Sequence, residues 1–304
     1  MHNLRNHSVI QKIAAEFLEE IGIVKPPLPI ELCLQARKLS VASESLDDFL
    51  SYEDGTCPIA HKPDAMLLVP ERTIWLKKGL HARHQEWAPM HELGHFILPW
   101  QCELLKHVCI FEVPEKLQRE WELEANLFTA ECRFLGSRFV EDAYALPFSL
   151  ATPIKLADQY AVSFEATFRK YVEHHHKACC LLVSHIGQDE RRLHIAGEEH
   201  QFKIQYYVSS PSFRVRINPR QVFTCSGVEP LLRPGGNHVV VEHAFPTQDA
   251  ITGELTEYFA QSFTNTYKLF TLLSSSPLDS ARLSAQAQGT IQLSTLRTAA
   301  RPSA

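Results

Sequence analysis

The segment His91-Glu92-Leu93-Gly94-His95 limits how this chain can fold. Two histidines four residues apart lie on one face only if the segment is helical, and there they are about 6 Å apart. The flanks, Ala88 before the motif and Phe96-Ile97-Leu98 after it, are apolar. We therefore predict a helix that begins within 83–90, is closed by Pro99 and buries one face.

Pro89, two residues before His91, bears on where this helix begins. Proline lacks the backbone N–H that a helix interior uses. Pro89 is harmless if the helix begins near Trp87, and it predicts a kink if the helix begins at Arg83.

The motif has the residue types of a hydrolytic metal centre. Two imidazoles on one helix face can bind a tetrahedral Zn²⁺, which lowers the pKa of a bound water from about 15.7 toward about 7. Glu92 can reach that water and accept its proton as the water attacks a carbonyl. The alternative is an exposed polar helix face, and the apolar flanks argue against it. We predict His91 and His95 as zinc ligands and Glu92 as general base.

A third ligand is predicted on a second helix, over 115–134. Glu122 and Asn126 lie four residues apart on one face of it, so Glu122 can bind the metal while Asn126 reaches one of the histidines. Glu124 is the rival ligand, and a plain surface carboxylate is the other alternative. The position of Asn126 favours Glu122.

Two predicted strands, 65–69 and 73–76, precede the motif helix. The order of strand pair, motif helix and glutamate helix is that of minimal zinc peptidases. A strand beside the site can hold an extended peptide through main-chain hydrogen bonds.

At this point the chain resembles the ImmA/IrrE family of metallopeptidases. The resemblance rests on the leading helices with Pro26-Pro27, on MHELGHFIL at 90–98 and on E-x-E-A-N-x-F-x-A from 122 to 130, and it covers roughly 10–175. By position it implies zinc bound by His91, His95 and Glu122, with Glu92 as base. It also implies cleavage of a helix-turn-helix repressor, which induces stress or mobile-element genes.

Residues 146–177 are predicted to be a helical connector. Its segment 155–171 has the shape of a helix-turn-helix, with Ser163 as N-cap. Arg169 and Lys170 are the positive charges of its second helix, and two cations give little affinity for phosphates. A packing helix pair is therefore preferred, and direct DNA binding is not expected.

The predicted fold class is α+β. We expect a zincin-like peptidase domain at 1–145, the connector, a β-rich sensor or docking domain at 178–273 and a flexible tail at 274–304. The β-rich domain rests on alternating segments at 178–184, 192–195, 202–208, 213–217, 237–242, 255–263 and 267–273.

Composition sets the remaining limits. The 304 residues carry a net charge of −5, which is no general nucleic-acid signature. No run of about 18 apolar residues and no secretory signal is found, so we expect a cytoplasmic protein without membrane segments. The eight cysteines form no C-x-x-C pair, which favours free thiols.

His174-His175-His176 is expected to be a solvated helix end, because successive helical residues cannot chelate together.

The sequence therefore predicts a zinc-dependent endopeptidase. The alternative is a regulatory DNA-binding or ligand-sensing protein with a vestigial zinc site, but such a site has no reason to keep Glu92. A structural zinc site is a third possibility, although structural sites have four protein ligands and three are found here.

Overall fold

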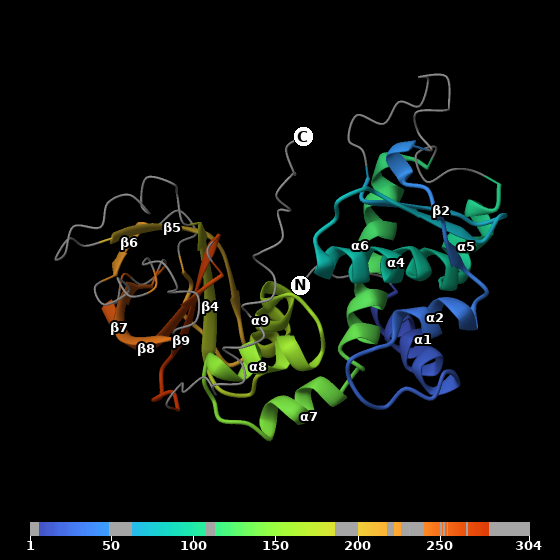
Figure 1. Cartoon of the computed structure of the whole chain (residues 1–304). Coiled ribbons are helices and arrows are strands. Elements are labelled where there is room, and N and C mark those ends of the chain that lie inside the picture. The colour runs from blue at the N-terminus through green and yellow to red at the C-terminus, as the bar shows by residue number, and fades with distance from the viewer. Residues whose placement is uncertain are drawn as a thin grey trace, which may run out of the picture. The chain divides into compact units, whose positions relative to one another are not determined.

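The computed structural model has a mixed α+β fold, as the sequence predicts. It describes residues 6–48, 63–107, 113–185, 200–217, 222–225, 231, 240–249, 251, 253, 255–265 and 267–279. These residues divide into two compact units (Figure 1). The first takes its residues from 1–139 and 159–162, and the second from 140–158 and 163–304.

The first unit begins with helices and a small sheet. Its first elements are α1 (His7–Glu20), α2 (Ile30–Ala36), β1 (Ser40–Val41), β2 (Ala65–Leu68) and β3 (Thr73–Leu76). The sheet order is β1-β3-β2, with β1 parallel and β2 antiparallel to β3. The two predicted strands are thus neighbours, and β2 is an edge strand of this sheet.

The motif helix α4 runs over Ala82–Ile97, so Pro89 lies inside it. Its first turn is capped by His81, whose Nδ1 accepts a hydrogen bond from the Arg83 N–H. Pro99 closes this helix and also begins α5 (Pro99–Leu105), which the sequence analysis did not predict. Proline suits the first position of a helix because its fixed φ is helical and no N–H is needed there.

The glutamate helix α6 (Glu115–Arg133) packs against α1 and α4. Gly94 of α4 makes the approach to α6 possible, because a Cβ at this position would lie 3.2 Å from the Cα of Ala125 and 3.3 Å from the ring of Phe128. The small residues Gly94 and Ala125 therefore let the two helices that carry the predicted ligands cross at short range.

The second unit is built on a six-stranded antiparallel sheet of order β6-β5-β4-β9-β8-β7. Helix α7 (Arg138–Tyr144) precedes α8 (Ala151–Gln159) and α9 (Phe164–Glu173). The strands are β4 (Cys179–His185), β5 (His200–Ser209), β6 (Val222–Cys225), β7 (Val241–Gln248), β8 (Leu255–Thr264) and β9 (Lys268–Ser274).

Helix α9 covers one face of this sheet. Phe168 contacts the rings of Phe263 and Phe270, and Phe164 contacts Phe263. The turn before α9 is capped by Ser163, which accepts from the Ala166 N–H, as predicted. The structure therefore places α9 within the second unit as a packing helix and not in a separate connector.

Two segments of the second unit differ from the strands that the sequence predicts. Residues 213–217 form no strand, although Phe213 and Ile217 are buried in the core. The strand expected at 237–242 begins at Val241 and runs to Gln248. The segments 192–195 and 280–304 lie outside the described residues.

Residues 274–279, which the sequence assigns to a flexible tail, are held by contacts with the second unit. Ser274 is the last residue of β9 and is buried. Asp279 accepts a hydrogen bond of 2.6 Å from the Phe148 N–H, and its carbonyl accepts one of 2.8 Å from Gln261. Polar contacts thus hold residues 275–279 in place, although this segment lacks aromatic residues and was therefore expected to be flexible.

Candidate metal centre

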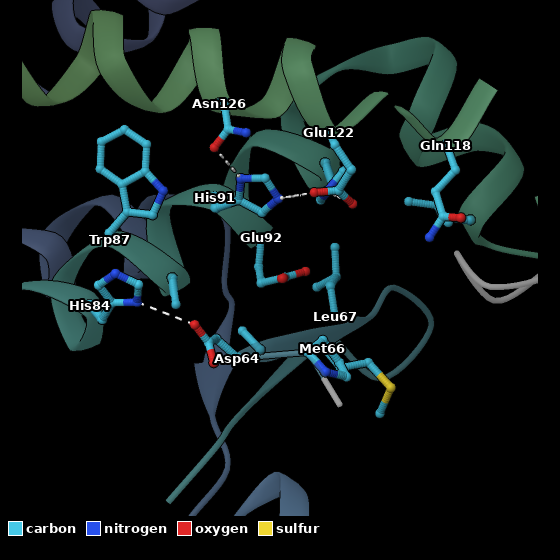
Figure 2. A pocket seen from close by; sticks show the side chains of 15 residues that line it. Asp64, Met66, Leu67, His84, Trp87, His91, Glu92, Gln118, Glu122 and Asn126 are labelled. Carbon is cyan, nitrogen blue, oxygen red and sulfur yellow. Dashed lines mark hydrogen bonds and ion pairs between the residues drawn. The ribbon is translucent and has the colours of Figure 1, made fainter. Parts of the chain in front are cut away.

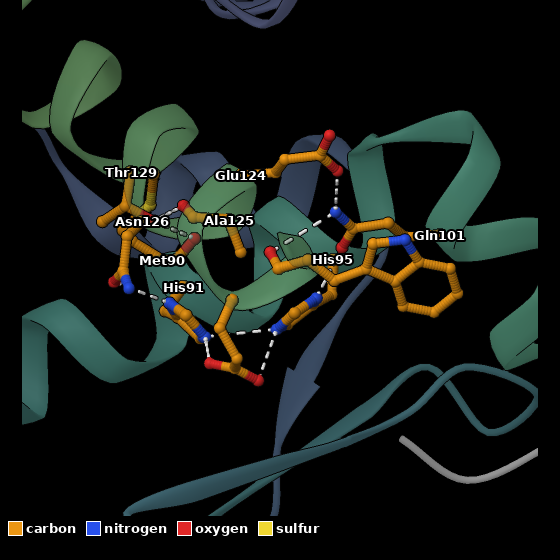
Figure 3. A network of polar contacts seen from close by, with 10 residues as sticks. Met90, His91, His95, Gln101, Glu124, Ala125, Asn126 and Thr129 are labelled. Carbon is orange, nitrogen blue, oxygen red and sulfur yellow. Dashed lines mark hydrogen bonds and ion pairs between the residues drawn. The ribbon is translucent and has the colours of Figure 1, made fainter. Parts of the chain in front are cut away.

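Two helices of the first unit bring three side chains together. His91 and His95 of α4 and Glu122 of α6 each offer one ligand atom, and these atoms all lie within 4.8 Å of one another. The His91 Nε2 is 3.0 Å from Glu122 Oε2 and 3.1 Å from His95 Nε2. The His95 Nε2 is 3.6 Å from Glu122 Oε1. Among the described residues this cluster is a candidate metal site (Figure 3).

The spacing and the donor types fit a tetrahedral metal ion. Two imidazole nitrogens and one carboxylate are a known ligand set of catalytic zinc, with bonds of about 2.0–2.2 Å. Tetrahedral geometry then separates neighbouring ligand atoms by about 3.3 Å. The two Nε2 atoms are 3.1 Å apart, and each lies 3.0–3.6 Å from a Glu122 oxygen, a different one for each ring, so the donors lie close to the spacing that one ion requires.

Amide oxygens hold the outer nitrogen of both rings. His91 Nδ1 is 3.1 Å from the Asn126 Oδ1, and His95 Nδ1 is 2.6 Å from the Gln101 Oε1. Because a carbonyl oxygen only accepts, these contacts favour a proton on each Nδ1, and in the neutral rings Nε2 is then the atom that can bind a metal. Asn126 thus lies where the sequence places it, beside a predicted ligand.

Glu92 lies in the cavity that the three side chains border. This cavity has a volume of about 380 Å³ and is also lined by Ala65 and Leu67 of β2. Figure 2 shows Glu92 between the pair of His91 and Glu122 and the strand that carries Leu67. Burial raises the pKa of Glu92, and the two histidines and a backbone hydrogen bond with Leu67 offset this only in part.

The half-buried carboxylate of Glu122 has a lowered pKa. Burial acts to raise its pKa, but the hydrogen bonds and charges of His91 and His95 outweigh this effect and hold the pKa well below its ordinary value. For His95 the balance is similar. Burial lowers its pKa, while Glu122 and Glu92 more than compensate and raise it.

Glu124, the rival third ligand, lies away from the ligand atoms. It is buried, and its carboxylate accepts hydrogen bonds of 2.7 Å from Asn6 Nδ2, Trp100 Nε1 and Gln101 Nε2. Sequence analysis did not identify Gln101, because the turn at Pro99 that brings it back to His95 follows a helix end at which no further helix was expected.

Other histidines take different places. His84 lines the same cavity, with its Nδ1 3.2 Å from Asp64 Oδ2. In the segment His174-His175-His176, His174 and His176 are exposed at the end of α9, as expected for a solvated helix end. His175 is buried, which corrects that expectation, because rings of the second unit surround it.

No protein-family model matches this chain, and no curated protein sequence matches it. Among solved structures, the chain is similar to a protein described as "Mycobacterium tuberculosis transcriptional regulator". The two are 13% identical with a TM-score of 0.49, over 88% of this chain and 76% of that chain. At this TM-score the likeness supports no conclusion about fold or activity.

None of the helices in the described part of the chain is long and apolar enough to cross a membrane.

Proposed function

We propose that this chain is a zinc-dependent endopeptidase of the ImmA/IrrE type. The observation that carries the proposal is the convergence of His91, His95 and Glu122 at the wall of a cavity that also holds the buried carboxylate of Glu92. A site that only stored or sensed a metal would have no use for a buried carboxylate at that place.

Each side chain has a distinct role in this proposal. A zinc ion held by three protein ligands polarises a carbonyl and lowers the pKa of water. Glu92 accepts the proton of the attacking water and delivers it to the leaving nitrogen. Its raised pKa suits both steps, because a general base works best when its pKa approaches the working pH.

The outer edge of β2 offers a place for the substrate backbone. The Asp64 carbonyl accepts a hydrogen bond from the Lys77 N–H. The backbone N–H and C=O groups of the even-numbered residues of β2 therefore point toward β3. Ala65 and Leu67 therefore direct their backbone groups away from β3, and both residues line the cavity. An extended peptide that pairs with this edge lies beside Glu92.

We propose a helix-turn-helix repressor as the substrate, as the resemblance implies, with the induction of stress or mobile-element genes as the outcome and the cytoplasm as the compartment. The second unit then senses a signal or docks the repressor.

The alternative, a non-catalytic DNA-binding or ligand-binding regulator, has less support from α9. Lys170 is buried, and Arg169 lies over the ring of Tyr206 and 3.7 Å from Glu173. Neither cation is thus free to contact phosphates, because one is buried and the other has contacts within the second unit. This leaves α9 little positive charge to bind the phosphates of DNA.

The test compares the full chain with its Glu92→Gln variant on a peptide library made from the proteins of the source cells, read by mass spectrometry. Glu92→Gln keeps the shape but cannot accept a proton, so we expect zinc content to be retained and the cleavage rate to fall about a hundredfold or more. Glu120→Gln, an exposed change on α6, is the matched control. Absence of cleavage by the zinc-loaded chain, or equal cleavage by Glu92→Gln, would contradict the proposal.

A further inference from the structure

Gln101 is completely buried between a predicted zinc ligand and a buried carboxylate. Its Oε1 is 2.6 Å from His95 Nδ1, and its Nε2 is 2.7 Å from Glu124 Oε2. The same Nε2 is 3.4 Å from the backbone carbonyl of Trp121. Figure 3 shows this line of contacts running from Glu124 through Gln101 to His95.

The donors and acceptors in this line allow one arrangement. The carboxylate of Glu124 accepts only, so the amide nitrogen of Gln101 must face it and the amide oxygen must face His95. That oxygen also accepts only, so His95 Nδ1 must carry a proton. When the ring of His95 is neutral, its lone pair is therefore on Nε2. This atom lies 3.1 Å from His91 Nε2.

Glu124 is itself held from two further directions. Asn6, at the start of α1, donates to its Oε1, and the indole of Trp100 donates to its Oε2. The orientation of the Gln101 amide is therefore set by a carboxylate that helices α1 and α5 both fix. A surface carboxylate would leave the amide free to turn over.

We infer that Glu124 and Gln101 are positioning residues of the metal centre, with Glu124 orienting the Gln101 amide and Gln101 holding His95 in the form that binds metal through Nε2. The inference rests on the proposed metal centre, but it concerns metal affinity and not the cleavage step. It also gives Glu124 a role although it lies away from the ligand atoms.

The first test measures the dissociation constant of Zn²⁺ for the full chain by competition with a chelator. Gln101→Met keeps the length and bulk of the side chain but removes the acceptor, so we expect zinc affinity to fall by about tenfold to a hundredfold. Glu124→Leu should weaken it similarly, because it frees the amide. Glu124→Gln should change it less than about threefold, since an amide oxygen can still accept from Gln101 while Asn6 turns.

Gln85→Leu is the matched control for the loss of an amide, because Gln85 is exposed on α4 and donates to the Leu80 carbonyl. Its zinc affinity should equal that of the wild type. Equal affinity in wild type, Gln101→Met and Glu124→Leu would overturn the inference alone. Absence of zinc binding by the wild type would overturn both it and the proposed function.

A second measurement needs no variant. Nitrogen–proton correlation spectra of the zinc-loaded wild-type chain should show a protected proton on His95 Nδ1, with Nε2 bound to the metal. A proton on Nε2 would overturn the inference even if every variant failed to fold. This spectrum does not depend on the cleavage activity that Glu92→Gln tests. The peptidase proposal and this inference can therefore fail separately.

Discussion

The two units differ in how they bury ionisable groups, and two buried histidines make the difference clear. His95 of the first unit is surrounded by groups that bond or carry charge, namely Glu122, Glu92 and Gln101, and together they raise its pKa in spite of burial. His175 of the second unit lies against the rings of Phe148, Tyr171 and Tyr144. There burial, with His176 and Lys177 nearby, lowers its pKa to about 4.

Two buried histidines thus have pKa values that are shifted in opposite directions. In the first unit, the buried ring of His95 lies between carboxylates and an amide, which can stabilise a charge or orient the ring as a metal ligand. In the second unit, the ring of His175 lies among aromatic side chains and its Nδ1 accepts a hydrogen bond from the Lys177 N–H, and both favour the neutral form. The candidate metal centre lies in the first unit, and the second unit is built on a packed sheet.

The largest expected effect comes from the buried charge at the far end of α6. Arg133 is buried, donates to Glu86 Oε2 at 2.7 Å and also donates to the carbonyl of Ala161. Arg133→Ala should lower the free energy of unfolding of the first unit by about 2–5 kcal/mol, because it empties the volume of a fully buried side chain and removes its hydrogen bonds to the half-exposed Glu86 and to the Ala161 carbonyl. Urea unfolding followed by tryptophan fluorescence measures this, since Trp75, Trp87, Trp100 and Trp121 all lie in the first unit.

Arg119→Ala is the control on the same helix. Its pair with Glu115 is largely exposed, so the change should stay below about 0.5 kcal/mol. If Arg133→Ala cost no more than this control, the first unit would not depend on its buried charges and the contrast with the second unit would fail.

A smaller effect should follow from the neutral histidine of the second unit. The pKa of His175 is about 4 in the folded chain against 6.5 for an ordinary histidine, so the unfolded chain binds more protons between these values. The contribution of neutral His175 to the free energy of unfolding is therefore fully present above pH 6.5 and is lost as the pH drops toward 4. Allowing for screening by solvent, we expect a loss of about 1–2 kcal/mol from pH 7.5 to pH 5.

Hydrogen exchange of the β4 and β9 amides, corrected for the intrinsic effect of pH, measures this loss in the second unit. His175→Phe keeps a ring in place and should abolish the pH dependence. His176→Gln, an exposed neighbour, should leave most of it. The same pH dependence in His175→Phe as in the wild type would show that another group is responsible.

The first unit is the part whose chemistry is most visible in the sequence. Helical spacing alone places His91 and His95 on one face and Glu122 beside Asn126, because both relations are local. The contact of Gln101 with His95 depends on the turn at Pro99, and the burial of Glu124 depends on Asn6 and Trp100, which come from other helices. Such contacts depend on tertiary packing, which no local pattern encodes.

The second unit shows a related limit. The pattern of apolar residues predicted β4, β8 and β9, although β4 and β9 are buried along nearly their whole length and do not have one exposed face. It failed at 213–217, where Phe213 and Ile217 reach the core from an irregular segment. It also could not show that His175 is buried, because the rings around it come from α7, α9 and the segment before α8.

Zinc content per chain tests most directly whether His91, His95 and Glu122 hold one metal ion. Elemental analysis of the dialysed full chain should give about one zinc for the wild type and for Glu124→Gln. His91→Ala, His95→Ala and Glu122→Ala should each reduce the content sharply, because three ligands hold the ion. Full zinc content in Glu122→Ala, with loss in Glu124→Gln, would contradict the account and make Glu124 the third ligand.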